Sequence, residues 1–215
     1  MATLKTGSEL NAALLTAMPS GGTVTFLGQN DIVDESTYSS KCSLASEDSY
    51  AAVTGYTNSG KTAMVVKCAD AFAIELNEDS AGAFSSEKQI FTFSGLNNLR
   101  SNNVVNGSKL FYKSKLSADD MSKWRFTNAT DLSYAFASTN ITSIPEAFSA
   151  VDSHMEKLTT LSHAFDSADI SNNVEMNCVT SAALTNLEYV FNGIAHGIDI
   201  SFGSNFDGSG ITTLE

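Results

Sequence analysis

The C-terminal part of this 215-residue chain repeats itself, and the repeat constrains the fold more than any other sequence feature. Four similar segments end in leucines that are 29, 26 and 27 residues apart: 129–132, 158–161, 184–187 and 211–214. In the first three segments a phenylalanine follows that leucine by four residues, at Phe136, Phe165 and Phe191. A leucine and a phenylalanine four residues apart share one face of a helical turn. Because one such unit cannot bury its own apolar face, we expect neighbouring units to stack around a continuous core.

The first unit reads Leu132-Ser-Tyr-Ala-Phe136-Ala-Ser-Thr-Asn-Ile141-Thr-Ser-Ile144-Pro145. It resembles the BspA-type leucine-rich repeat and the related repeat of mycoplasma surface lipoproteins. Residues 161–165 and 187–191 repeat its first half, whereas the Ile-Pro ending occurs only in the first unit. The resemblance covers residues 124–215. It implies a leucine-rich-repeat solenoid, a fold that serves mainly as an adhesion and binding surface.

The first half of the chain has a different pattern, typical of a helix followed by short strands. Thr6-Gly-Ser-Glu9 matches a capping box and predicts a helix that reaches Met18. Short apolar or alternating runs predict strands at 23–27, 63–69, 72–76 and 89–93. A short helix is expected at 117–124, with Ser117 as its cap and Asp119 and Asp120 at its positive end.

Together these patterns predict an α/β fold class with two parts. A small N-terminal α+β attachment domain is expected over residues 1–116, followed by a leucine-rich-repeat solenoid over residues 117–215. Leu214 falls inside a fourth unit, so we expect the repeats to continue beyond Glu215.

Composition excludes two large functional classes. The chain carries 24 acidic and 12 basic residues, a net charge of −12, and only 17% of its residues are charged. Such a protein lacks the basic patch that nucleic acid requires, and anionic membranes repel it. The N-terminus lacks the order of a signal peptide, and no apolar run is long enough to span a bilayer. The widely spaced Cys42, Cys68 and Cys178 are expected to be buried thiols in a protein folded in a reducing cytoplasm.

The segment 55–62 matches the nucleotide-binding pattern G-x-x-x-x-G-K-[ST] to the letter, and Gly60, Lys61 and Thr62 would be its phosphate-binding residues. A phosphate-binding loop must lie between a buried strand and a helix. Residues 63–69 have strand character instead. A turn between two strands therefore explains the segment better than a nucleotide site does.

No other pattern indicates catalysis, a metal or a cofactor. His154, His163 and His196 lack metal-ligand spacing, and no nucleophile motif is present. The glycine-rich segment 203–210 lacks the alternating acidic ligands of a calcium loop. We expect no cofactor.

The sequence predicts a non-enzymatic structural or adhesion protein. A phage virion component, such as a head- or tail-fibre protein, folds in the host cytoplasm yet acts outside the cell, which fits the missing signal peptide. The N-terminal part would bind other virion proteins or sister subunits in a homo-oligomer, and the repeats would bind a host surface protein or glycan. Tyr134, His163 and Tyr189 occupy comparable repeat positions and form the predicted binding face. The alternatives are a cytoplasmic protein-interaction module and an enzyme, either nucleotide-binding or carbohydrate-active.

Overall fold

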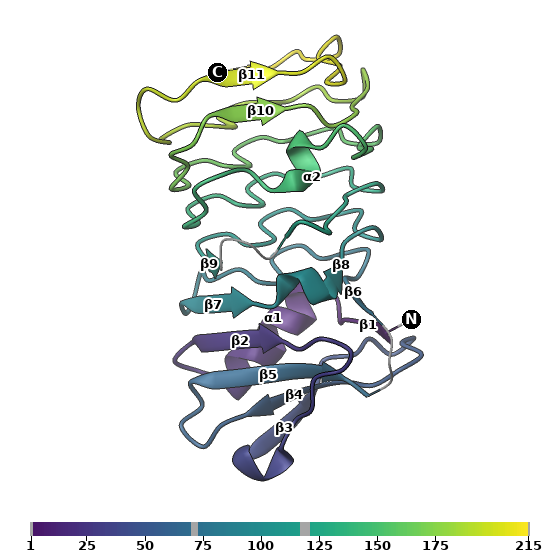
Figure 1. The fold of residues 1–215 in the computed structure, drawn as a ribbon, viewed down its shortest axis with the longest axis vertical. Helices are drawn as coiled ribbons and strands as arrows, with labels where there is room; N and C mark the ends of the chain where they lie inside the picture. The colour runs from purple at the N-terminus through teal and green to yellow at the C-terminus, as the bar shows by residue number, and fades with distance from the viewer. Residues whose placement is uncertain (1, 70–72, 117–120, 215) are drawn as a thin grey trace.

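The structure is a computed structural model that describes residues 2–69, 73–116 and 121–214. It consists mainly of short strands and turns arranged along one long axis, with β3 near one end and β11 near the other (Figure 1). Its two described α-helices are α1 (Gly7–Ala17) and α2 (Glu146–Ser149), and 3₁₀ helices span Glu35–Thr37 and Leu96–Asn98. No helix in these ranges is long and apolar enough to cross a membrane.

Three sheets contain the strands. The largest has six, in the spatial order β3 (Ser40–Ser43), β4 (Val53–Thr57), β5 (Ala63–Cys68), β2 (Gly22–Phe26), β7 (Phe91–Ser94) and β9 (Lys115–Leu116). Its pairings are parallel except those that β4 makes with β3 and β5. A parallel three-stranded sheet joins β1 (Ala2–Thr3), β6 (Ile74–Glu75) and β8 (Leu99–Arg100). The third sheet is the parallel pair β10 (Val174–Met176) and β11 (Ile200–Phe202).

Local predictions in the first half are confirmed. The backbone N–H of Thr6 donates to the Glu9 carboxylate at 3.3 Å, which closes the capping box at the start of α1. Leu10 and Leu14 of this helix are buried. The predicted strands are found as β2, β5, β6 and β7, although Phe72 of the third run lies outside the described residues.

The predicted fold class is wrong. The structure is mostly sheet, with about a tenth of its residues in helices and a six-stranded mixed sheet as its main element, and no leucine-rich-repeat solenoid is recognised in it. The helical turn expected at 132–136 is absent because Tyr134 has a φ of 57°, and Ser138 follows with 55°. An α-helix requires negative φ throughout, so these left-handed residues prevent its hydrogen-bond pattern.

The predicted boundary between residues 116 and 117 stays a prediction. One cluster of buried apolar side chains extends from Ala2 to Val190 and includes residues on both sides of that boundary. The expected helix at 117–124 falls largely on Ser117, Asp119 and Asp120, which lie outside the described residues. The three residues after them, 121–123, form a turn.

A stack of five phenylalanine rings lies in the core between residues 84 and 191. Successive ring centroids lie 5.0, 5.5, 5.5 and 5.5 Å apart, with interplanar angles of 28° or less. The rings belong to Phe84, Phe111, Phe136, Phe165 and Phe191. All except Phe191 are fully buried.

Each of these rings belongs to one layer, which we define as the turn that begins five residues before the phenylalanine. Single parallel bridges connect the first residues of adjacent layers: Asp79 to Asn106, Asn106 to Asp131, Asp131 to Thr160, and Thr160 to Asn186. The layers therefore follow one another in constant register, and equivalent side chains come to lie side by side.

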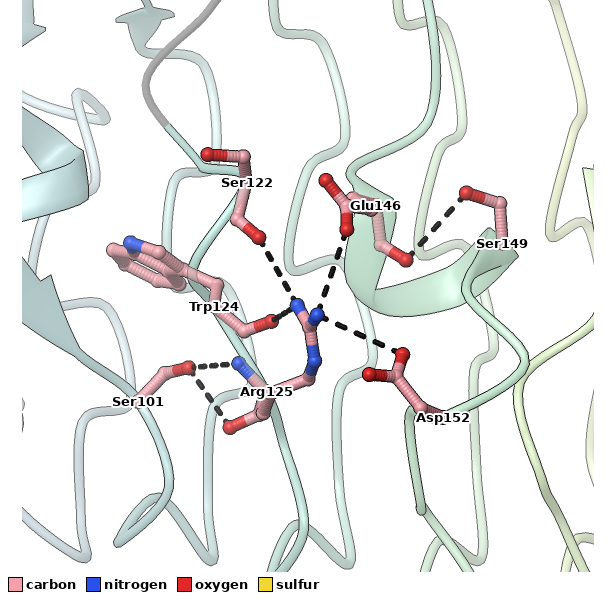
Figure 2. Close-up of polar contacts among 7 residues, drawn as sticks. All are labelled: Ser101, Ser122, Trp124, Arg125, Glu146, Ser149 and Asp152. Carbon is pink, nitrogen blue, oxygen red and sulfur yellow. Dashed lines mark hydrogen bonds and ion pairs between the residues drawn. The ribbon is translucent and has the colours of Figure 1, made fainter.

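Arg125 connects parts of the chain that are distant in sequence (Figure 2). Its backbone N–H donates to the Ser101 hydroxyl at 2.8 Å, and that hydroxyl donates back to the Arg125 carbonyl oxygen at 2.9 Å. Its guanidinium lies 3.5 Å from Glu146 Oε1 in α2 and 3.7 Å from Asp152 Oδ1. These contacts connect Arg125 to the segments that contain Ser101, α2 and Asp152.

Candidate functional site

The candidate site begins with a turn that recurs in each layer. The first residue of the turn accepts a hydrogen bond from the backbone N–H two residues later, as Asp131 does from Ser133 at 2.8 Å and Asn186 does from Glu188 at 2.9 Å. Such side chains initiate turns by bonding to the nearby backbone. The fourth residue of the turn then adopts a left-handed conformation, with φ between 52° and 65°, at Gly82, Lys109, Tyr134, His163 and Tyr189.

Four rings on this surface form what we call the aromatic column: Tyr112, Tyr134, His163 and Tyr189. Tyr134 and His163 are stacked, with centroids 4.4 Å apart and an interplanar angle of 7°. His163 and Tyr189 lie 4.9 Å apart at 38°, and Tyr112 meets Tyr134 edge-on at 6.1 Å. The three residues that the sequence placed at comparable repeat positions thus lie in contact with one another.

The backbone conformation beneath the column is costly for these residue types. A left-handed residue other than glycine costs about 1–2 kcal/mol, and glycine occupies the equivalent position in the first layer, at Gly82. An aromatic pair contributes about 0.5–1.5 kcal/mol beyond the burial of its area. His163, which contacts a ring on each side, therefore offsets most of its own backbone strain by stacking.

A polar network fixes the orientation of His163, the third ring of the column. His163 Nδ1 lies 2.8 Å from Asp166 Oδ2, and both side chains are 20% exposed. The other carboxylate oxygen of Asp166 accepts hydrogen bonds from Ser167 Oγ at 2.9 Å and Asn192 Nδ2 at 3.0 Å. Partial burial opposes ionisation of Asp166, but hydrogen bonds from His163, Ser167 and Asn192 outweigh it and lower its pKa.

Two lysines lie at the Tyr112 end of the column. The ammonium nitrogens of Lys109 and Lys113 are 5.4 and 4.8 Å from the ring centroid of Tyr112, within the range of cation–π contacts. Lys109 also pairs with Glu87 at 3.0 Å, and this hydrogen bond raises the pKa of the lysine. The column therefore has two lysines at its first ring, Tyr112, and the Asp166 carboxylate at its third, His163.

The stacking determines which atoms of the column a ligand can contact. The faces of Tyr134 and His163 cover each other, so their edges and polar atoms remain for contact. Tyr189, the last ring, is 37% exposed. Phenol, imidazole, carboxamide and carboxylate groups held in one row can donate and accept hydrogen bonds. Among the described residues no serine or cysteine is hydrogen-bonded to His163 as a nucleophile would be.

The nucleotide-like segment 55–62 lies elsewhere: it covers the end of β4 and the turn that joins β4 to antiparallel β5. Lys61 is left-handed in this turn, with φ 52°. The backbone N–H groups of Thr62 and Ala63 donate to Asn58 Oδ1 at 2.9 and 3.1 Å, and strand β5 begins at Ala63. Gly60, Lys61 and Thr62 are thus followed by a strand instead of a helix N-terminus, as the interpretation of this segment as a turn predicts.

The remaining sequence candidates are spread over the surface and the core. His154 Nδ1 lies 2.9 Å from Glu156, and His196 is exposed in a turn. In the glycine-rich segment 203–210, Asp207 accepts a hydrogen bond from the backbone of Ser209. Within the described ranges no group of three or more His, Cys, Asp or Glu could hold a metal ion. All three cysteines are free, and burial raises the pKa of Cys178 to about 12.

Sequence reasoning missed the first two layers and the residues that they contribute. Asp79 precedes Phe84 by five residues and Asn106 precedes Phe111 by five, the same spacing as in the later layers. A search for Asp, Asn or Thr five residues before Phe would have found both layers, and with them Lys109 and Tyr112. The leucine pattern hid them because the residue after Asp79 is Ser80 and the residue after Asn106 is Gly107, at the position where the three later layers have leucine.

Comparisons with protein-family models, with curated proteins and with solved structures found no match to this chain.

Proposed function

We propose that this chain is a non-enzymatic binding protein that holds a glycan along the aromatic column. The observation that carries the proposal is the alignment of Tyr112, Tyr134, His163 and Tyr189 in successive layers. The backbone strain at three of these positions supports a role for the side chains themselves, because glycine serves the same turn at Gly82.

Preorganised polar groups favour a ligand rich in hydroxyls. Asp166 already holds His163, Ser167 and Asn192 in fixed positions, so binding a ligand there orders few side chains. At about 4.8 Å between adjacent strands, the four layers span roughly 15 Å, enough for a short run of sugar rings. The rings of the column supply apolar surface beside these polar groups.

For the biological setting in which the chain binds its ligand, we keep the prediction made from the sequence. We propose that the chain is a phage virion component, that residues 1–116 attach it to virion proteins or sister subunits, and that the ligand belongs to the host surface. The composition, in which only 17% of the residues are charged, supports this setting. Detection of the chain in purified virions by mass spectrometry tests it, and absence from purified virions contradicts it.

A glycan array tests the binding proposal directly. The wild-type chain should retain specific glycans, and Tyr134→Ala should lose them because the variant removes a ring from the middle of the column. Tyr50→Ala is the matched control, since Tyr50 is 91% exposed and lies outside the column. A wild-type chain that retains no glycan, or a Tyr134→Ala variant with an unchanged profile, contradicts the proposal. Retention of a host surface protein through the same residues would favour the protein ligand instead.

A further inference from the structure

A hollow of about 260 Å³ lies at the end of the aromatic column that carries Lys109. Its lining includes Gly82 and Lys109, which hold the left-handed position of the first two layers, where each of the next three layers carries an aromatic side chain. Gly82 leaves space there because it has no side chain, and the nearest atom that a Cβ at this position would meet, Ser85 Cβ, is 3.9 Å away. The hollow therefore continues the column by one layer.

The walls of this hollow contain a polar group that lacks a partner. Helix α1 forms one wall, where Asn11 Nδ2 donates a hydrogen bond to Ser85 O at 2.8 Å. Ser85 is only 8% exposed, and its hydroxyl has no hydrogen-bond partner among the residues that the structure describes. Buried hydroxyls are nearly always hydrogen-bonded, and an unpartnered one lowers the stability of the fold. A ligand oxygen in the hollow would supply the missing partner.

The charge of the hollow is opposite to that of the whole chain. Lys88 and Lys109 border it together with Glu87, whose carboxylate lies 3.0 Å from Lys109 Nζ. Lys88 has no ion pair within the described ranges, and Lys113 adds a third ammonium group beside Tyr112. These charges sum to a positive value, whereas the chain as a whole carries −12. The hollow therefore attracts an anionic group that most of the surface repels.

We propose that this hollow holds the acidic end of the glycan that the aromatic column binds, so that the terminal sugar of the ligand carries a carboxylate or a sulfate. The inference rests on the proposed function of the column. Lys88 pairs with the anionic group, and the Ser85 hydroxyl donates to the same sugar. At about 4.8 Å per layer, Gly82 is two layers, or roughly 10 Å, from Tyr134, so one short glycan reaches both.

A glycan array of matched pairs tests this proposal on the full chain. The two members of a pair differ in one anionic group: a sialylated glycan and its desialylated form, a uronic acid oligomer and its carboxyl-reduced form, or a sulfated glycan and its unsulfated form. We expect the acidic member of a retained pair to bind at least roughly tenfold more tightly in titration calorimetry. The net charge of −12 would favour the neutral member, so this preference reports the local lysines. Comparison of the pairs shows whether the group is a carboxylate or a sulfate.

Variants of the chain locate the anionic group. Lys88→Gln should weaken binding of the acidic member roughly tenfold, to the affinity of the neutral member. Lys61→Gln is the matched control, because Lys61 is exposed in the turn between β4 and β5, outside the hollow. Ser85→Ala should raise the urea midpoint of unfolding, since it removes an unpartnered hydroxyl, and should weaken binding of the acidic member about fivefold.

The outcomes separate this proposal from that for the column. Equal affinity for the two members of every pair, or equal losses in Lys88→Gln and Lys61→Gln, overturns the assignment of the hollow. If Tyr134→Ala still abolishes retention in that case, the proposed function of the column stands. Unchanged affinity in Ser85→Ala contradicts the contact with the hydroxyl. A chain that retains no glycan overturns both proposals.

Discussion

The phenylalanine stack predicts that truncating one of its rings lowers the free energy of unfolding by an amount that depends on how deeply the ring is buried and how many rings contact it. Phe136 is fully buried, with Phe111 and Phe165 stacked on it at 5.5 Å and Phe148 edge-on at 5.9 Å. Phe191, at the end of the stack, is half-buried and has Phe165 as its one ring neighbour among the described residues. Phe136→Ala and Phe191→Ala therefore remove the same atoms from two different environments.

The expected losses of unfolding free energy differ by several kcal/mol between the two variants. Truncating a fully buried phenylalanine to alanine costs about 3–5 kcal/mol, because the lost contacts and the cavity both destabilise the fold. Phe136 has three ring partners, each pair contributing about 0.5–1.5 kcal/mol, so its truncation belongs at the upper end, about 4–5 kcal/mol. Phe191 has one such pair and less burial, which gives about 1–2 kcal/mol. A domain of total stability near 5–15 kcal/mol would lose a large share of it in Phe136→Ala.

Urea unfolding measures this difference, with the fluorescence of the single tryptophan as the probe. Trp124 is buried, its indole N–H donates to Leu96 O at 2.8 Å, and its ring lies 5.4 Å from that of Phe111. Its emission therefore reports loss of the core next to the stack. Equal losses of unfolding free energy in the two variants would refute the reasoning, because they would show that burial and ring contacts do not set the cost.

Three further predictions follow from individual residues. Ser138→Gly should raise the unfolding free energy by about 0.5–1 kcal/mol in urea, because it relieves a left-handed conformation at an exposed position; a loss of stability would contradict this. The pKa of Asp166 is lowered in the fold, so its contribution is complete above the ordinary carboxyl pKa and is lost as the pH falls through the lower folded value. The stability difference between wild type and Asp166→Asn should therefore shrink as unfolding is measured from pH 5 down to pH 2, and a constant difference would oppose the assignment. Calorimetry with ATP should give no binding heat for wild type or Lys61→Ala; heat that the variant abolishes would restore the nucleotide site.

The first half of the fold could be predicted because its signals are local. A capping box fixes the start of α1, and alternating apolar residues specify strands such as β5. The turn between β4 and β5, at 58–62, followed from the strand character after Thr62. Each of these signals acts within a few residues, so no knowledge of the tertiary structure was needed.

The second half was misread because two conformations share one spacing. Leucine and phenylalanine four residues apart are typical of a helical turn, but a turn with a left-handed residue also places both in the core. The leucine–phenylalanine spacing alone does not distinguish them, and Tyr134 gives no signal of its own because left-handed residues other than glycine are uncommon. The turn is indicated instead by an Asp, Asn or Thr three residues before the left-handed residue, because the side chain of this residue accepts a backbone hydrogen bond.

The candidate site was predictable in part. Tyr134, His163 and Tyr189 could be chosen because they occupy equivalent positions in the repeat. Their contact distances depend on the spacing of the layers, which no short sequence pattern encodes. Tyr112 was missed for another reason: it follows Phe111 directly, so it contacts Tyr134 from a position that is not equivalent to 134, 163 and 189.

The central claim is that the aromatic column binds the ligand, and NMR spectra of tyrosine- and histidine-labelled chain test it most directly. Three of the six tyrosines, at 112, 134 and 189, belong to the column, and Tyr38, Tyr50 and Tyr56 do not. Addition of a glycan retained on the array should shift the resonances of the column tyrosines and of His163 while the other three tyrosines stay unchanged. Shifts confined to Tyr38, Tyr50 and Tyr56, or a bound glycan that leaves the column resonances in place, would contradict the claim.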